Sequence, residues 1–171
     1  MSGDVDNIIP LVSQAYAERL AHRRASPHVG LFDLLEQVKD PEIPVLSIWD
    51  LGILRDATVT ENRVEVPITP TYSGCPAMSM IAEQVEEVLR GAGHNSVNVV
   101  SRLSPAWTTD WMAPDARTRL REYGIAPPDS AACPNCGSND TEVVSEFGST
   151  ACKALYKCRQ CLEPFDHFKH L

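Results

Sequence analysis

The sequence predicts an α/β fold, a small sheet with helices packed on it, followed by a small C-terminal module held together by a metal ion. The first observation is a helix–strand–strand–helix–strand order of apolar patterns over residues 27–124, which is typical of a sheet covered by helices. The second is a pair of C-x2-C steps with 21 residues between Cys136 and Cys158. We therefore expect an N-terminal helix and tail (1–26), an α/β domain (27–124), a linker (125–132) and a zinc-ribbon module (133–171).

Two helices are expected before the first strand. Residues 11–25 have a modest amphipathic pattern. Ser26-Pro27 then predicts the start of a second helix, because a serine cap followed by proline is a common N-terminal signal. Asp40-Pro41 predicts its end, since the residue before proline disfavours helical geometry.

Two extended runs follow, at 53–60 and 63–68, with Glu61-Asn62 as a hairpin turn between them. Pro67 lacks an N–H, so we expect the second run to lie at a sheet edge or to carry a bulge. The clearest helix follows Pro76, because an apolar stripe opposes acidic residues until Gly91. A third strand is expected at 95–103 and a short helix at 114–123.

Four cysteines in two C-x2-C steps are the predicted ligands of a structural zinc ion: Cys133, Cys136, Cys158 and Cys161. Two such turns brought together by a hairpin complete a tetrahedral S4 shell. Two disulfides or two unrelated turns are the alternative. Cys152 is interpreted as a spare thiol, although it, His167 or His170 could compete for a ligand position.

Composition narrows the class of protein. The chain of 171 residues has a net charge of −8, which disfavours nucleic-acid binding because that requires a positive field. Its apolar runs are too short to span a bilayer. The acidic N-terminus lacks the pattern of a secretory signal. We expect a cytoplasmic protein with no membrane or nucleic-acid partner and with reduced cysteines.

Cys75 is the main candidate functional residue of the α/β domain. It directly precedes the predicted helix, where unpaired N–H groups and the helix dipole are expected to lower the pKa of its thiol. Such a thiolate could act as a nucleophile or bind a soft metal. The alternative is a small buried hydrophobic residue. His28 and His94 are the nearest histidines in sequence, so a cysteine-hydrolase interpretation is weak.

Two further groups of residues are candidates. Asp40, Glu42 and Asp50 could orient Cys75, bind iron or take part in acid–base chemistry, or could merely form turns. Trp107 and Trp111 share one short loop and suggest an exposed surface for docking a partner. The alternative is a loop folded onto its own core.

Several motifs extend this interpretation: Asp40-Pro41-Glu42-Ile43-Pro44, Asp50-Leu51-Gly52 and Gly74-Cys75-Pro76. Together they resemble the metal–sulfur cluster assembly domain family, small α/β proteins that assist iron–sulfur cluster delivery. Other motifs are Thr71-Tyr72-Ser73-Gly74-Cys75-Pro76, Pro105-Ala106-Trp107-Thr108-Thr109-Asp110-Trp111, Cys133-Pro134-Asn135-Cys136-Gly137-Ser138 and Glu163-Pro164-Phe165. With these, the chain is similar to the PaaD-type family, whose members belong to the phenylacetyl-CoA epoxidase complex, from about residue 31 to residue 169.

The resemblance implies an accessory role. The family's oxygenase uses a di-iron subunit, and a flavin and iron–sulfur reductase supplies electrons. This sequence has neither paired Glu-x-x-His helices nor a Gly-rich nucleotide turn, so we do not expect it to be catalytic alone. The resemblance implies that Cys75 passes on iron or an iron–sulfur cluster transiently, held by the loops of Asp40, Glu42 and Asp50. The expected partners are the other subunits of the complex. Since one cysteine cannot hold a cluster, we also expect a homodimer or a bridged complex.

Three other hypotheses stay open. The chain could be a non-catalytic structural subunit that docks through Trp107 and Trp111. It could be a redox protein with iron in the four-cysteine site, as in rubredoxins. A zinc-ribbon nucleic-acid binder is disfavoured by the charge.

Overall fold

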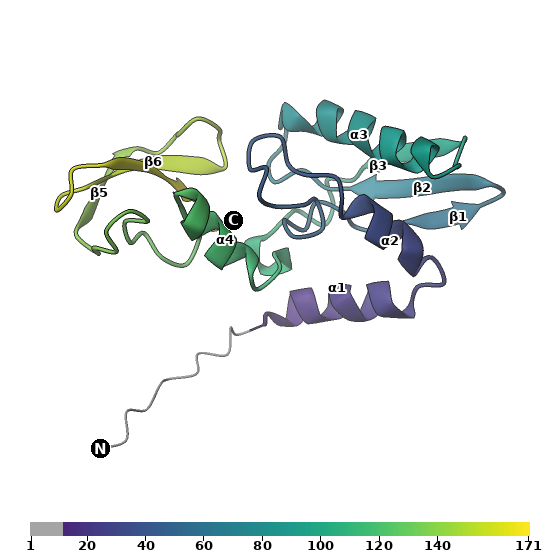
Figure 1. The fold of residues 1–171 in the computed structure, drawn as a ribbon, viewed down its shortest axis with the longest axis horizontal. Helices are drawn as coiled ribbons and strands as arrows, with labels where there is room; N and C mark the ends of the chain where they lie inside the picture. The colour runs from purple at the N-terminus through teal and green to yellow at the C-terminus, as the bar shows by residue number, and fades with distance from the viewer. Residues whose placement is uncertain (1–11) are drawn as a thin grey trace, which may run out of the picture.

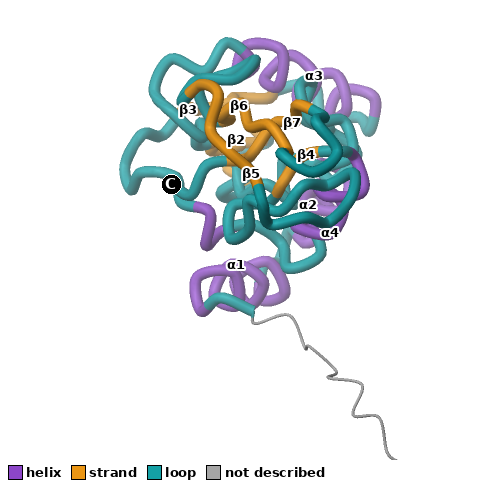
Figure 2. Tube along the Cα trace, turned by 90° about the vertical axis from the view of Figure 1, so that its left-hand side faces the viewer, coloured by secondary structure: helices purple, strands orange, loops and turns teal. Residues whose placement is uncertain are grey.

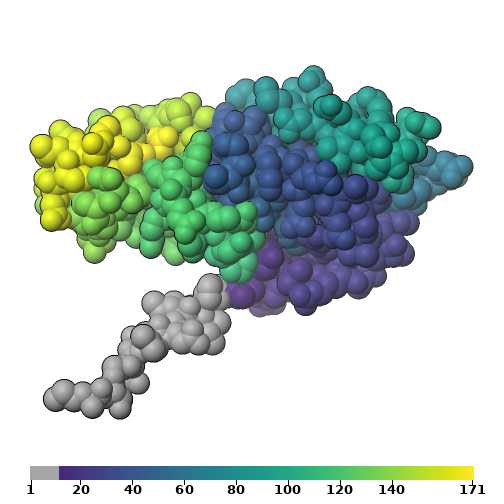
Figure 3. Space-filling model, in the orientation of Figure 1, coloured from purple at the N-terminus to yellow at the C-terminus, as the bar shows by residue number. Residues whose placement is uncertain are grey.

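Two sheets, one in each half of the chain, organise the molecule into two lobes that contact each other (Figures 1 and 3). The structure is a computed structural model and describes residues 12–171. The front lobe contains α1 (Gln14–Ala25), α2 (Val29–Leu35), β1 (Thr58–Thr60), β2 (Arg63–Ile68), α3 (Ala77–Gly91), β3 (Val97–Ser101) and the 3-10 helix η1 (Thr109–Trp111). The helix α4 (Ala116–Tyr123) leads into β4 (Ile125–Ala126), β5 (Thr141–Ser145), β6 (Lys153–Cys158) and β7 (Pro164–Phe168).

The front sheet has the strand order β1-β2-β3, with β1 antiparallel and β3 parallel to β2. A parallel pair needs a crossover connection, and α3 supplies it. The buried face of α3 carries Ala77, Ile81, Val85 and Leu89, four residues apart in turn, so that one stripe faces the sheet. The expected fold class, a small α/β sheet with helices packed on it followed by a cysteine-rich ribbon, is confirmed.

The expectation that the strand containing Pro67 lies at an edge is wrong, because β2 is the central strand. The β1 ladder ends at the pair Thr58–Glu65, two residues before Pro67. Beyond that point the chain needs no N–H from Pro67, and its carbonyl accepts the N–H of Arg55 at 2.9 Å. The first strand is correspondingly shorter than the expected run 53–60, and Leu54 forms only an isolated bridge with Ile68.

The N-terminal helix α1 is fastened to the front lobe by a buried arginine. Arg19 is 9% exposed, and its guanidinium donates to the carbonyls of Trp49 and Leu54 at 3.1 and 3.3 Å and to that of Trp111. It also stacks over the Trp49 ring, 4.1 Å from the centroid. Figure 1 shows α1 running along one side of the front lobe, and Figure 2 shows it at the edge of the molecule. Leu11, the first residue of the expected helix, lies outside the described residues.

The second sheet has the order β4-β7-β6-β5. The expected linker 125–132 begins with β4, which pairs with β7 in parallel. Ile125, Cys152 and Phe168 belong to the same buried cluster as the front-lobe core, and the Phe168 ring lies 5.9 Å from that of Trp107. The two lobes therefore share one continuous apolar interface. Among the described residues, no helix is long and apolar enough to cross a membrane.

Candidate functional site

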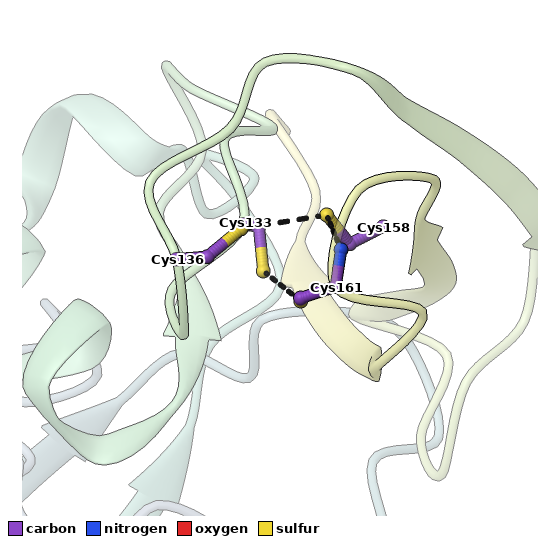
Figure 4. Close-up of side chains that lie close together, drawn as sticks. All are labelled: Cys133, Cys136, Cys158 and Cys161. Atoms are coloured by element: carbon purple, nitrogen blue, oxygen red, sulfur yellow. Dashed lines mark hydrogen bonds between the residues drawn. The ribbon is translucent and has the colours of Figure 1, made fainter.

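The ribbon brings its four C-x2-C cysteines to one point. The Sγ atoms of Cys133, Cys136, Cys158 and Cys161 all lie within 4.8 Å of one another, and Figure 4 shows the side chains converging from two turns. Cys133 and Cys161 are 3.7 Å apart, and Cys136 and Cys158 are 3.6 Å apart. These distances exclude S–S bonds, and all six cysteines are free.

The sulfur spacing fits a tetrahedral metal ion. Four sulfurs about 2.3 Å from a central zinc would lie roughly 3.8 Å apart, which matches the two pairs. The backbone N–H of Glu163 and the amide of Asn135 lower the pKa of the Cys161 thiol to about 6, which favours the thiolate, the form that binds a metal. At Cys136, the N–H of Ser138 lowers the pKa, but desolvation and contacts with the other three sulfurs outweigh it and raise the pKa to about 12, so a bound cation would have to displace that proton. In the described chain this is the one group of three or more such side chains close enough to hold an ion. Cys152, His167 and His170 are not part of it.

Cys75 lies in the loop that leads into α3, as the sequence predicts. It precedes the cap residue Pro76, is half-buried, and packs against the edge of the front-lobe core. The backbone N–H of Ala77 and the hydroxyl of Tyr72 both interact with its sulfur and favour the thiolate. The helix start therefore does present an N–H group to this thiol.

The predicted lowering of the Cys75 pKa is nevertheless wrong. Burial raises the pKa of the thiol above its usual range, and the charges of Glu42 and Asp40 raise it further. These effects outweigh the N–H of Ala77. Unassisted, Cys75 is thus a protonated thiol at neutral pH, and a bound cation would have to displace its proton.

The structure brings Asp40 and Glu42 close to Cys75. Asp40 is buried, and its Oδ1 accepts the N–H groups of Glu42 and Ile43 at 2.8 and 2.9 Å. Burial raises the pKa of both carboxyls, while the ammonium of Lys153 acts in the opposite direction. Asp40 therefore shapes the turn, and that turn places the Glu42 carboxylate beside the thiol.

Asp50 does not join this group. Its carboxylate pairs with Arg119 of α4 at 2.9 and 3.0 Å and accepts the N–H of Ser47 at 2.8 Å. Burial would raise the pKa of Asp50, but the hydrogen bonds from Arg119 and Ser47 outweigh it and hold this pKa below its usual range. Asp50 ties α4 to the loop before β1, which is a structural role.

Trp107 and Trp111 do not form the expected docking surface. They are 5% and 8% exposed, and Trp107 Nε1 donates to the carbonyl of Leu51 at 2.8 Å. The Arg55 guanidinium lies 3.5 Å from the centroid of the Trp111 ring. The loop folds onto its own core because both rings find apolar cover and Trp107 finds an acceptor for its N–H.

Three residues of the ribbon, Thr150, Cys152 and Lys153, lie near Glu42. Thr150 interacts with Glu42, and its hydroxyl lies 3.1 Å from Cys152 Sγ. Lys153, 5% exposed, pairs with Asp166 at 3.7 Å. The sequence singles out Cys152 as a spare thiol but places none of the three near Glu42, because they follow it by more than 100 residues and no spacing rule links them to it.

Two family models match separate parts of the chain. Residues 31–101 match the family described as iron-sulfur cluster assembly protein, and residues 121–169 match the PaaD zinc beta ribbon domain. The first match contains Asp40, Glu42 and Cys75, and the second contains the four clustered cysteines and Cys152.

Individual proteins and one solved structure are also similar to this chain. A protein of Escherichia coli named as one of the subunits of 1,2-phenylacetyl-CoA epoxidase is 52% identical over 156 residues, covering 85% of this chain and 94% of its own length. A protein of Porphyromonas gingivalis named as an Fe-S protein maturation auxiliary factor is 34% identical, over 51% of this chain and 84% of its own. A crystal structure of a DUF59 domain from Bacillus anthracis superposes with a TM-score of 0.50 and 29% identity, over 61% of this chain and 95% of that one.

Proposed function

The chain belongs to the PaaD-type family of 1,2-phenylacetyl-CoA epoxidase components, and from this premise we propose that it is a maturation factor for that oxygenase. In this role it binds iron or an iron–sulfur cluster transiently at Cys75 and passes this cargo to another component of the complex. It is an accessory protein and does not oxidise the substrate itself. We place it in the cytoplasm, with the other subunits as its partners.

One observation carries this proposal: the only cysteine within the iron–sulfur assembly match is half-buried beside two carboxylates. Its partial exposure leaves the sulfur within reach of a partner. The nearby Asp40 and Glu42 carboxylates favour approach of a cation. The raised pKa of Cys75 makes the bound cargo easy to release, because a proton competes for the sulfur.

The ribbon has a different proposed role. A zinc ion would be held by the four clustered cysteines of the ribbon, Cys133, Cys136, Cys158 and Cys161. It would cross-link two turns of a lobe that is too small for a large hydrophobic core. Four sulfurs fill a tetrahedral shell, so such a site has no open position for cargo. The zinc is therefore structural.

Co-production with the oxygenase subunits tests the function of Cys75. We expect Cys75→Ser to lower both the iron content and the activity of the purified oxygenase at least tenfold. Zinc bound to the variant chain should stay at one ion, because the ribbon cysteines are untouched. Ser73→Ala, an exposed neighbour in the same loop, is the matched control and should behave as the wild type.

Full activity with Cys75→Ser would contradict the maturation role. If the chain then still co-purified with the oxygenase in fixed stoichiometry, the result would favour a structural role in the complex instead. A coloured protein with iron in the four-cysteine site would favour a redox role.

A further inference from the structure

Cys152 is the one ribbon cysteine that does not join the tetrathiolate. It immediately precedes β6 and is 5% exposed, and it packs with the front-lobe core instead of with the ribbon's own buried cluster. Cys75 packs against that same front-lobe core. Two free thiols from different lobes therefore pack on one apolar cluster at the lobe interface, near enough for charge on Cys75 to act on Cys152.

Side chains of both lobes connect these two thiols. Thr150 lies 3.1 Å from Cys152 Sγ and interacts with Glu42. The charge of Glu42 in turn raises the pKa of both thiols, and negative charge on Cys75 disfavours it on Cys152. A soft divalent cation would offset this repulsion by binding both sulfurs as thiolates.

The ribbon holds Cys152 in place from both ends of β6. At one end, the Cys152 carbonyl accepts the N–H of Lys169 at 2.9 Å, and the N–H of Lys153 reaches the Thr150 carbonyl at 3.2 Å. At the other end, Cys158 is a member of the tetrathiolate. The two cysteines are six residue steps apart along the strand, which corresponds to roughly 20 Å. A metal in the tetrathiolate thus fixes the strand that presents Cys152 to the front lobe.

We propose that Cys75 and Cys152 together form a two-thiolate site for a soft divalent cation such as iron(II), shared between the two lobes. This inference rests on the proposed function and supplies its missing second sulfur from within the same chain. Each thiol loses one proton when its bond to the cation forms, and no oxidant or reductant is involved. The remaining positions of the cation stay open to ligands of the recipient, so a homodimer is not needed.

Cobalt(II) is the probe for this site. Zinc outranks cobalt for the same set of ligands, so protein purified with zinc in its tetrathiolate should keep that zinc while cobalt fills the second site. Added without air, cobalt should bind to the wild type at one equivalent and produce thiolate-to-cobalt charge-transfer absorption. Cys152→Ser and Cys75→Ser should each lose about half of this absorption and bind cobalt at least tenfold more weakly, whereas Ser73→Ala should match the wild type.

Failure of the shared metal site can be distinguished from failure of the maturation role. If Cys152→Ser binds cobalt as the wild type does while Cys75→Ser does not, the two-thiolate site is overturned and Cys75 alone remains. If the wild type takes up no cobalt, the shared site is likewise overturned. The role of Cys75 in maturation is then still tested by the activity and iron content of the co-produced oxygenase. X-ray absorption of the cobalt-loaded wild type needs no variant to fold: two sulfur neighbours support the site, and one or none contradicts it.

Discussion

The tetrathiolate and the Cys75–Cys152 pair are two cysteine sites built in opposite ways. The tetrathiolate comes from two local turns of one lobe, its sulfurs already lie at tetrahedral spacing, and it is closed. The Cys75–Cys152 pair comes from two lobes, with Glu42 from a third segment beside it, and Cys75 remains partly open. A closed site suits a permanent metal, whereas an open one that depends on an interface suits cargo that must leave.

Removal of the ribbon metal should have the largest effect. Cys158→Ser, or exhaustive chelation, should unfold the second sheet, because binding of a structural zinc is worth about 10–16 kcal/mol of folding free energy. The front lobe should stay folded, since its sheet and α3 lie outside the ribbon. Circular dichroism and thermal unfolding measure both parts, with Cys152→Ser as a control that keeps its zinc. A ribbon that stays folded without metal would contradict the structural role of the zinc.

Gly52 tests how tightly the front lobe is packed. It has a φ of +78°, and a Cβ there would lie 2.6 Å from Trp111 Cβ. Gly52→Ala should therefore cost about 2–4 kcal/mol of unfolding free energy, through backbone strain and a steric clash. Gly30 is the matched control: it is exposed within α2 and has nothing within 4 Å. Gly30→Ala should be neutral or stabilise the fold in the same urea titration.

The Asp50–Arg119 pair should contribute a smaller, pH-dependent stability. Since folding lowers the pKa of Asp50, its contribution is present above the unfolded-state pKa and is lost as the pH falls through the folded-state pKa. Arg119→Ala should cost about 1–2 kcal/mol at pH 7 and less at pH 3. Arg117→Ala, which breaks the more exposed pair with Asp129, should change little. An equal cost of Arg119→Ala at both pH values would contradict this assignment.

The smallest expected effect concerns the reactivity of Cys75. Because burial raises its pKa, its thiolate fraction at pH 7 is reduced, and alkylation should run more slowly than for an exposed cysteine. The rate should rise as the pH passes above the usual thiol range. Tyr72→Phe should slow the reaction further, since the tyrosine hydroxyl favours the thiolate. Mass spectrometry of iodoacetamide-treated protein measures each rate, and a fast reaction at pH 7 would refute the raised pKa.

Local patterns predict one of these sites and miss most of the other. The four ribbon cysteines follow from their spacing, and the position of Cys75 before α3 follows from the apolar stripe of that helix. The approach of Cys152 to Cys75 depends on how two lobes pack, which no local pattern encodes. The same holds for Asp50 and Arg119, which lie 69 residues apart, and for Trp107 and Trp111, whose loop carries no signal that distinguishes core from surface.

The central claim is that the tetrathiolate keeps its metal while the Cys75–Cys152 site passes iron on. It is most directly tested by measuring where each metal goes. The protein, with zinc in its ribbon and isotopically labelled iron in the Cys75–Cys152 site, is mixed without air with iron-free oxygenase, and both metals are measured in each protein. We predict that labelled iron moves to the oxygenase, that the zinc stays behind, and that Cys75→Ser transfers no iron above the uncatalysed rate. Equal transfer by Cys75→Ser, or passage of the ribbon metal to the oxygenase, would contradict the account.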